Sequence, residues 1–221
     1  MALDSGRRVL CFDGRIEHTL DFSLVNGLEE GGLFVVRSFG GDGRPAVLLA
    51  EALRRRRATV VVYDYCLYSC ASYLLFASST AFVFKGTLVA WSLPVSEHLC
   101  SSFEEARDDG PKRLENKVCS YAPPEYQAAY EDLKEMNKWY VWTRAIDPSM
   151  EYPPQTAFVR RVLRNRFGER GRYPSNLLWT WNPRYYASTM KTRVVYEAYP
   201  ENQDEVDTMT ASFDLRVIYD P

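Results

Sequence analysis

The first part of the chain alternates short apolar runs with segments that have helical spacing. Runs rich in branched and aromatic residues, typical of buried strands, occupy residues 7–12, 33–37, 59–63, 81–84 and 87–91. Between the second and third runs, residues 45–57 have the apolar spacing of a helix, with Pro45 in the first turn. Residues 20–28 and 69–78 predict two further short helices. This strand–helix–strand order predicts an α/β fold in which parallel strands are joined by right-handed crossovers.

The character of the chain changes after residue 94. The stretch that follows is charged and loop-like. Later predicted elements are a long helix at 124–143, a basic amphipathic helix at 156–167, and β-like stretches at 177–181, 192–199 and 212–219. We therefore expect a core at residues 1–94, a helical extension at 95–172 packed on that core, and a β-rich segment at 173–221, together forming one compact unit.

Composition narrows the class of protein. The chain has 221 residues, of which 46% are hydrophobic and 14% aromatic, as expected for a globular protein. The net charge of −2 argues against a nucleic-acid binder, which normally carries a basic balance. No apolar stretch reaches the ~18 residues of a membrane span, so none is expected. Residues 1–5 have no features of a signal peptide.

The chain contains five cysteines, an odd number, so at least one is unpaired within the chain. Cys66 and Cys70 would share one face of a helix, as a local disulfide or as a thiol pair. Cys100 and Cys119 bracket the charged stretch and form the more plausible loop-closing bridge. With two histidines and no Cys-x-x-Cys pair, the sequence indicates no zinc site, and we expect no cofactor.

Four segments, taken in order, resemble a known family. They are the strand 34–38 with Phe39-Gly40-Gly41-Asp42, the strand 59–62, the run Cys66-Leu67-Tyr68-Ser69-Cys70-Ala71-Ser72-Tyr73-Leu74, and Ala90-Trp91-Ser92-Leu93-Pro94. This order resembles the ClpP/crotonase superfamily. It is most similar to bacterial, periplasmic-type ClpP-like serine-protease-like proteins with a Cys-x-Ser-small-Cys-Ala segment. The resemblance covers about residues 9–94, and it implies a ClpP/crotonase-like core and an extracytoplasmic (periplasmic or secreted) location.

Acyl transfer in that architecture needs a nucleophile, a base, an orienting carboxylate and backbone donors for the oxyanion. The resemblance assigns the donor role to Gly40 and Gly41, together with Cys70. The nucleophile position is ambiguous. Alignment on the cysteines places Tyr68 in the serine slot, whereas alignment on the downstream Leu-Leu-Phe-Ala favours Ser69. Ser69 is then either a shifted nucleophile or a structural residue such as a helix cap.

The position of the base also departs from the family pattern. Ser92, 24 residues after Tyr68, fills the slot where the family has histidine, and serine cannot accept a proton at pH 7. His98 lies in the following loop and is a candidate that could reach back. Lys85 is a candidate for a Ser-Lys dyad if it is buried. Asp147 falls at a plausible distance for the orienting acid, although an Asp before Pro also ends helices.

Three functions follow from this pattern. The first is a pseudoenzyme that keeps the scaffold, has a degraded Ser/His site and binds a peptide or protein partner. The second is an active serine hydrolase with a rearranged site that uses Ser69. The third is a crotonase-like acyl-CoA enzyme, in which paired N–H groups stabilise an enolate. The tyrosine-rich helix and the Trp179/Trp181 strand form either core packing or, as the alternative, the interface of a homo-oligomer.

Overall fold

The computed structural model describes residues 1–92, 156–168, 174 and 176–221. Along the N-terminal part the elements are β1 (Ala2–Leu3), β2 (Val9–Asp13), the 3-10 helix η1 (Ser23–Gly27), β3 (Leu33–Ser38), α1 (Gly43–Arg55), β4 (Thr59–Leu67), the π-helical turn η2 (Cys70–Leu74), β5 (Thr80–Val83) and β6 (Leu88–Ser92). Along the C-terminal part they are α4 (Ala157–Phe167), β7 (Leu177–Trp179), η3 (Pro183–Tyr185), α5 (Tyr186–Thr189), β8 (Arg193–Tyr196), α6 (Gln203–Thr210) and β9 (Arg216–Ile218).

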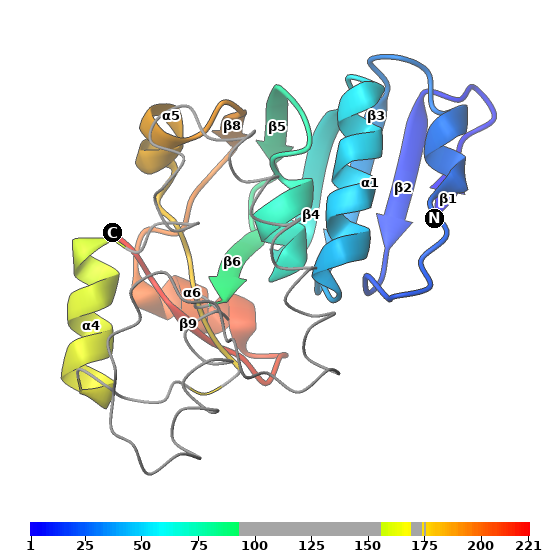
Figure 1. The fold of residues 1–221 in the computed structure, drawn as a ribbon. Coiled ribbons are helices and arrows are strands. Elements are labelled where there is room, and N and C mark those ends of the chain that lie inside the picture. The colour runs from blue at the N-terminus through cyan, green and yellow to red at the C-terminus, as the bar shows by residue number, and fades with distance from the viewer. Residues whose placement is uncertain (93–155, 169–173, 175) are drawn as a thin grey trace, which may run out of the picture.

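The predicted parallel core is confirmed. Strands β2, β3, β4 and β5 pair in parallel, and α1 connects β3 to β4 across one face of the sheet (Figure 1). The inward residues of β3 and β4, among them Phe34, Val36, Val60 and Val62, are fully buried in the same cluster as Leu53 of α1. Burial of these side chains holds the helix on the sheet, at roughly 25 cal/mol per Å² of apolar surface.

The sheet forks at β4. The first half of this strand pairs with β5, and its second half, from Tyr65 to Leu67, pairs with β6. The register against β3 shifts between these halves, and Asp64 in the shifted segment has a left-handed φ of 63°. Extra residues of this kind bend a strand and increase its twist. One branch continues from β5 to β8, and the other runs β6-β7-β9 (Figure 1).

The C-terminal segment belongs to the same sheet. β8 extends the β5 branch in parallel, whereas β7 pairs antiparallel with β6 and parallel with β9. The β-rich prediction for 173–221 was incomplete, because α6 was missed. The sequence of α6 is mostly polar, and Val206 is its one fully buried apolar residue, so it has no clear apolar spacing of a helix. The predicted helix at 69–78 was also wrong in length, since only the short turn η2 forms there.

Two further expectations stay predictions. The predicted helix at 124–143 and the proposed Cys100–Cys119 bridge lie outside the described residues. A search of the described residues found no helix with the length and hydropathy needed to cross a membrane.

Candidate functional site

The carboxyl ends of β3, β4 and β6 meet at one edge of the sheet. Ser38 of β3 is paired with Cys66 of β4, and Leu67 with Ala90 of β6. The N–H of Tyr68 donates to the Ala90 carbonyl at 3.1 Å, which fixes the turn after β4 against β6. The sequence segments predicted to form the site are therefore neighbours in space. Ligands of open α/β sheets bind at such an edge.

Gly40 lies in direct contact with the backbone of the turn after β4. Its φ of +71° is the left-handed conformation that glycine adopts without strain. A Cβ added at this position would overlap the Leu67 carbonyl oxygen and would lie 2.8 Å from the Ser69 nitrogen and 2.9 Å from the Tyr68 Cβ. No other residue type fits this contact without displacing backbone, so glycine here is required by packing as well as by conformation.

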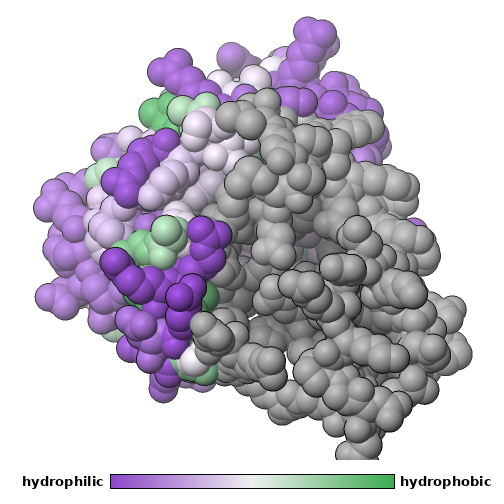
Figure 2. All heavy atoms as spheres, turned by 60° about the vertical axis from the view of Figure 1, so that its left-hand side comes forward, coloured by the Kyte–Doolittle hydropathy of each residue, from purple (hydrophilic) through white to green (hydrophobic). Residues whose placement is uncertain are grey.

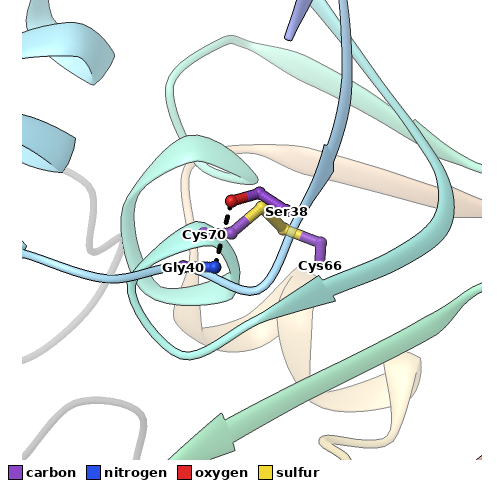
Figure 3. The surroundings of a disulfide bond; sticks show 4 residues. All are labelled: Ser38, Gly40, Cys66 and Cys70. Atoms are coloured by element: carbon purple, nitrogen blue, oxygen red, sulfur yellow. Dashed lines mark hydrogen bonds between the residues drawn. A yellow bond between two sulfur atoms is a disulfide. The ribbon is translucent and has the colours of Figure 1, made fainter. Parts of the chain in front are cut away.

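A second segment clamps the glycine turn from the other side. The N–H of Ile16 donates to the Gly40 carbonyl, and the N–H of Asp42 donates to the Ile16 carbonyl, both at 2.8 Å. The Gly40 N–H itself donates to Ser38 Oγ at 3.0 Å (Figure 3). Gly40 therefore does not offer the free N–H that was expected of an oxyanion donor. The Gly41 N–H finds no acceptor among the described residues.

A disulfide joins the end of β4 to the start of η2. Cys66 and Cys70 are bonded, with Cα atoms 5.3 Å apart and both side chains fully buried (Figure 3). Of the two possibilities for this pair, the structure contains the bridge, although Cys66 lies in a strand and the pair does not share a helix face. The bridge spans Tyr68 and Ser69, so it constrains the turn that presents both side chains.

Tyr68 occupies the most constrained position of this turn. Its φ of +50° is unusual for a residue with a side chain and costs of order 1–3 kcal/mol, a strain that the surrounding structure must hold. The half-buried ring packs against a buried apolar cluster that includes Leu67, Leu88 and Ala90. Burial raises the pKa of the Tyr68 phenol, and the charge of Arg15 opposes this shift. The phenol is therefore protonated at neutral pH.

Ser69 is placed differently from its neighbour. Its side chain is 7% exposed, and its Oγ has no hydrogen-bond partner among the described residues. A nucleophilic serine needs a base within about 2.6–3.2 Å and access to a substrate carbonyl. The described residues provide neither for Ser69. The capping role is also absent, because no side-chain cap hydrogen bond forms at this helix start.

The structure describes Ser92 and Lys85, two of the remaining residues predicted for the site. Ser92 ends β6 and is partly exposed, two residues beyond the Ala90 carbonyl that binds the Tyr68 turn. Lys85 is exposed, so the burial that a Ser-Lys dyad requires is missing and this candidate was wrong. His98 and Asp147 lie outside the described residues.

Sequence reasoning missed three residues around this turn. Ile16 supplies the clamp on Gly40, and Arg15 beside it supplies the charge that acts on Tyr68. Phe213, from the segment after α6, places its ring edge against Phe39 and Tyr65, with centroids 5.2 and 5.4 Å away. Only the turn residues Asp13-Gly14 gave a signal near Ile16, and nothing local in the sequence links Phe213 to residue 39.

The described residues contain no group of three or more His, Cys, Asp or Glu side chains that could hold a metal ion. Comparison with protein-family models found none that matches this chain, and comparison with curated proteins found no match either.

Proposed function

We propose that this chain is a ClpP/crotonase-related pseudoenzyme that has lost its Ser/His pair and acts by binding a peptide or protein partner. The observation that carries the proposal is the position of Tyr68. Its Cβ lies against the Gly40 turn, in the slot where the resemblance expects a nucleophilic serine. The half-buried tyrosine ring occupies that position and packs against a buried apolar cluster that includes Leu67 and Leu88.

The electrostatics of the turn support a role without catalysis. A phenol whose pKa is raised by burial is a weak nucleophile at neutral pH. The serine next to it is shielded and has no base among the described residues. Without a nucleophile–base pair, an acyl-transfer site retains only the contribution of binding and of its oxyanion donors, orders of magnitude below an intact triad.

The buried disulfide supports an oxidising compartment for this protein. Structural disulfides persist in periplasmic and secreted proteins and are rare in reducing cytosols. This agrees with the location implied by the ClpP-like resemblance, and it favours a binding role outside the cytoplasm.

The test combines a fluorophosphonate probe with hydrolysis of p-nitrophenyl acetate. We expect wild type and Ser69→Ala to show the same low rate and no labelling. The matched variant Tyr68→Ser/Ser92→His restores the family pattern, and we expect weak esterase activity and labelling from it. Robust wild-type turnover that Ser69→Ala abolishes would replace the proposal with the rearranged hydrolase. CoA-ester binding by wild type would favour the acyl-CoA enzyme.

The binding half of the proposal is tested separately. Wild type is used to select peptides from a display library of random dodecapeptides, and the selected peptides are measured against Tyr68→Ala. We expect Tyr68→Ala to weaken at least one class of selected peptides, because it removes the half-buried ring that the turn after β4 presents. If no peptide is selected, or if every selected peptide binds both proteins equally, Tyr68 is not part of a peptide site.

A further inference from the structure

The outer edge of β9 is occupied by a side chain instead of a strand. The inner edge of β9 pairs with β7, where the Arg216 N–H donates to the Asn176 carbonyl and the Thr180 N–H to the Ile218 carbonyl. On the outer edge, the amide of Gln203 makes both contacts. Its Nε2 donates to the Val217 carbonyl at 2.7 Å, and the Tyr219 N–H donates to its Oε1 at 2.9 Å.

These two hydrogen bonds have the pattern of one residue in a parallel strand. In a parallel ladder, a residue donates its N–H to the carbonyl before its partner and accepts from the N–H after it. Gln203 does this around Ile218, between the Val217 carbonyl and the Tyr219 N–H. Its Nε2 also donates to Asp207 Oδ1 at 2.8 Å, and this bond fixes the amide orientation. The Gln203 amide therefore imitates the N–H and C=O of a single residue in an added strand.

An open groove of about 690 Å³ lies along this edge. Its apolar lining comes from α4, β7 and the β9 segment, and comprises Phe158, Val162, Leu177, Leu215, Val217 and Ile218. Figure 2 shows that the described part of the face it draws is mostly hydrophilic, with apolar residues exposed only in small patches. A lining with several apolar side chains, beside a strand edge whose pairing groups are held by a side chain, is suited to an extended segment.

The charges of the groove favour an acidic segment. Arg166 and Arg216 line it and are exposed, and neither forms an ion pair among the described residues. The acidic residue of the lining, Asp207, already accepts a hydrogen bond from Gln203. A carboxylate of the incoming segment would therefore face two arginines that are not already paired with an acidic side chain of the described residues.

We propose that the β9 edge binds an extended peptide with alternating apolar and acidic side chains, added as a parallel strand that displaces the Gln203 amide. The peptide's backbone would take over the Val217 carbonyl and the Tyr219 N–H, and would add a bond from the Val217 N–H, which has no acceptor among the described residues. The apolar side chains of the peptide would contact the apolar lining of the groove, and its acidic side chains would face Arg166 and Arg216. This surface is separate from the Tyr68 turn, so the two proposals can fail independently.

The bonding pattern favours a peptide over a second copy of the chain. Two copies related by a twofold axis would pair their β9 strands antiparallel, whereas the Gln203 amide occupies the parallel arrangement. Tyr68 is not among the residues that line the groove. Ser92 pairs with Leu178, and Leu178 with Val217, so two strand spacings, about 10 Å, separate Ser92 from the groove strand.

The test uses an end-capped, fluorescein-labelled heptapeptide of alternating valine and glutamate, with fluorescence anisotropy as the measurement. We expect wild type to bind it, and Gln203→Ala to bind it about fivefold tighter, because the peptide no longer competes with the amide. Arg216→Glu should weaken binding severalfold. Arg193→Glu on β8 is the matched charge control and should leave it unchanged. A lysine analogue of the peptide and one with a central proline should bind more weakly.

Hydrogen exchange at single amides decides the mode of binding. In Gln203→Ala without peptide, we expect the Tyr219 amide to lose protection, and peptide should restore it and also protect the Val217 amide. The proposal is overturned if no protein binds the valine–glutamate peptide, or if binding leaves the Val217 amide unprotected. It is also overturned if Gln203→Ala dimerises in sedimentation and peptide does not dissociate the dimer, which would identify a second copy as the occupant.

Discussion

Two regions of the molecule, the turn after β4 and the branch of β7 and β9, hold their backbones in place by different means. At the turn after β4, main chain packs directly on main chain at Gly40, and a disulfide closes the same turn. In the branch of β7 and β9, side chains supply the bonds, as the Gln203 amide and the Tyr199 hydroxyl each bind a backbone carbonyl. The first region therefore depends on available space, and the second on the protonation and hydrogen bonding of side chains.

Gly40→Ala should have the largest effect on stability. We expect it to lower the free energy of unfolding by about 3–4 kcal/mol, the sum of left-handed strain and overlap with the Tyr68 turn. Gly86→Ala is the matched control, since Gly86 has a similar φ of +77° but open space where a Cβ would be. It should cost only about 1 kcal/mol. Urea unfolding measures both, and equal losses would contradict the close packing at Gly40.

Asp220 should dominate the pH dependence of the second region. Its side chain is fully buried, and neither carboxylate oxygen has a partner of normal hydrogen-bond geometry among the described residues. Burial raises the pKa of Asp220 to about 6, against smaller opposing effects of the Thr156 hydroxyl and Arg184. Because the folded state holds this proton more tightly, its contribution to stability is present below pH 4 and is lost as pH rises to about 6.

We therefore expect the free energy of unfolding of wild type to fall by about 3 kcal/mol between pH 4 and pH 7 because of this group. Asp220→Asn should not show this fall. The measurement is the free energy of unfolding at several pH values, compared between variant and wild type. Asp214→Asn, on an exposed residue of the same segment, is the control and should run parallel to wild type. A constant difference between Asp220→Asn and wild type across this range would refute the raised pKa.

The sequence predicts the features that follow from local apolar spacing, and it does not predict those that depend on tertiary contacts. The strands at 33–37 and 59–63 and the helix between them follow from apolar spacing, and the structure confirms their parallel pairing. The bulge at Asp64 and the placement of Gln203 on β9 depend on tertiary contacts that no local pattern encodes. For the site, the neighbouring positions of the Gly40 and Tyr68 turns could be predicted, whereas the clamp by Ile16 could not.

The disulfide should contribute less than the glycine contact. Closing so short a loop restricts the unfolded chain by about 2 kcal/mol, so dithiothreitol should lower the free energy of unfolding by that amount. Cys66→Ala/Cys70→Ala should be less stable than wild type and insensitive to the reductant. If that variant still responds, a second bridge is present, and Cys100–Cys119 is the expected pair. An unchanged wild type would show that the bridge contributes nothing.

The smallest predicted effect lies in the hydrogen bonds around Tyr199. Its hydroxyl donates to the Asp220 carbonyl at 3.0 Å and lies 2.8 Å from Thr180 Oγ1. Tyr199→Phe should cost about 1 kcal/mol at pH 7, because it leaves these groups partly unsatisfied. Tyr185→Phe, which removes a hydroxyl bound by exposed Arg184, is the control and should cost less.

The same variant tests the role of burial at high pH. Burial strongly raises the pKa of the Tyr199 phenol, so the stability it provides is complete below pH 10, and wild type should lose it as pH rises further. Tyr199→Phe should therefore approach wild type in unfolding free energy above pH 10. If the difference in unfolding free energy between the two proteins stays constant or widens there, the hydroxyl is not buried as described. The stability of the second region would then not depend on the protonation of Tyr199, and the contrast with the turn at Gly40 would fail at this residue.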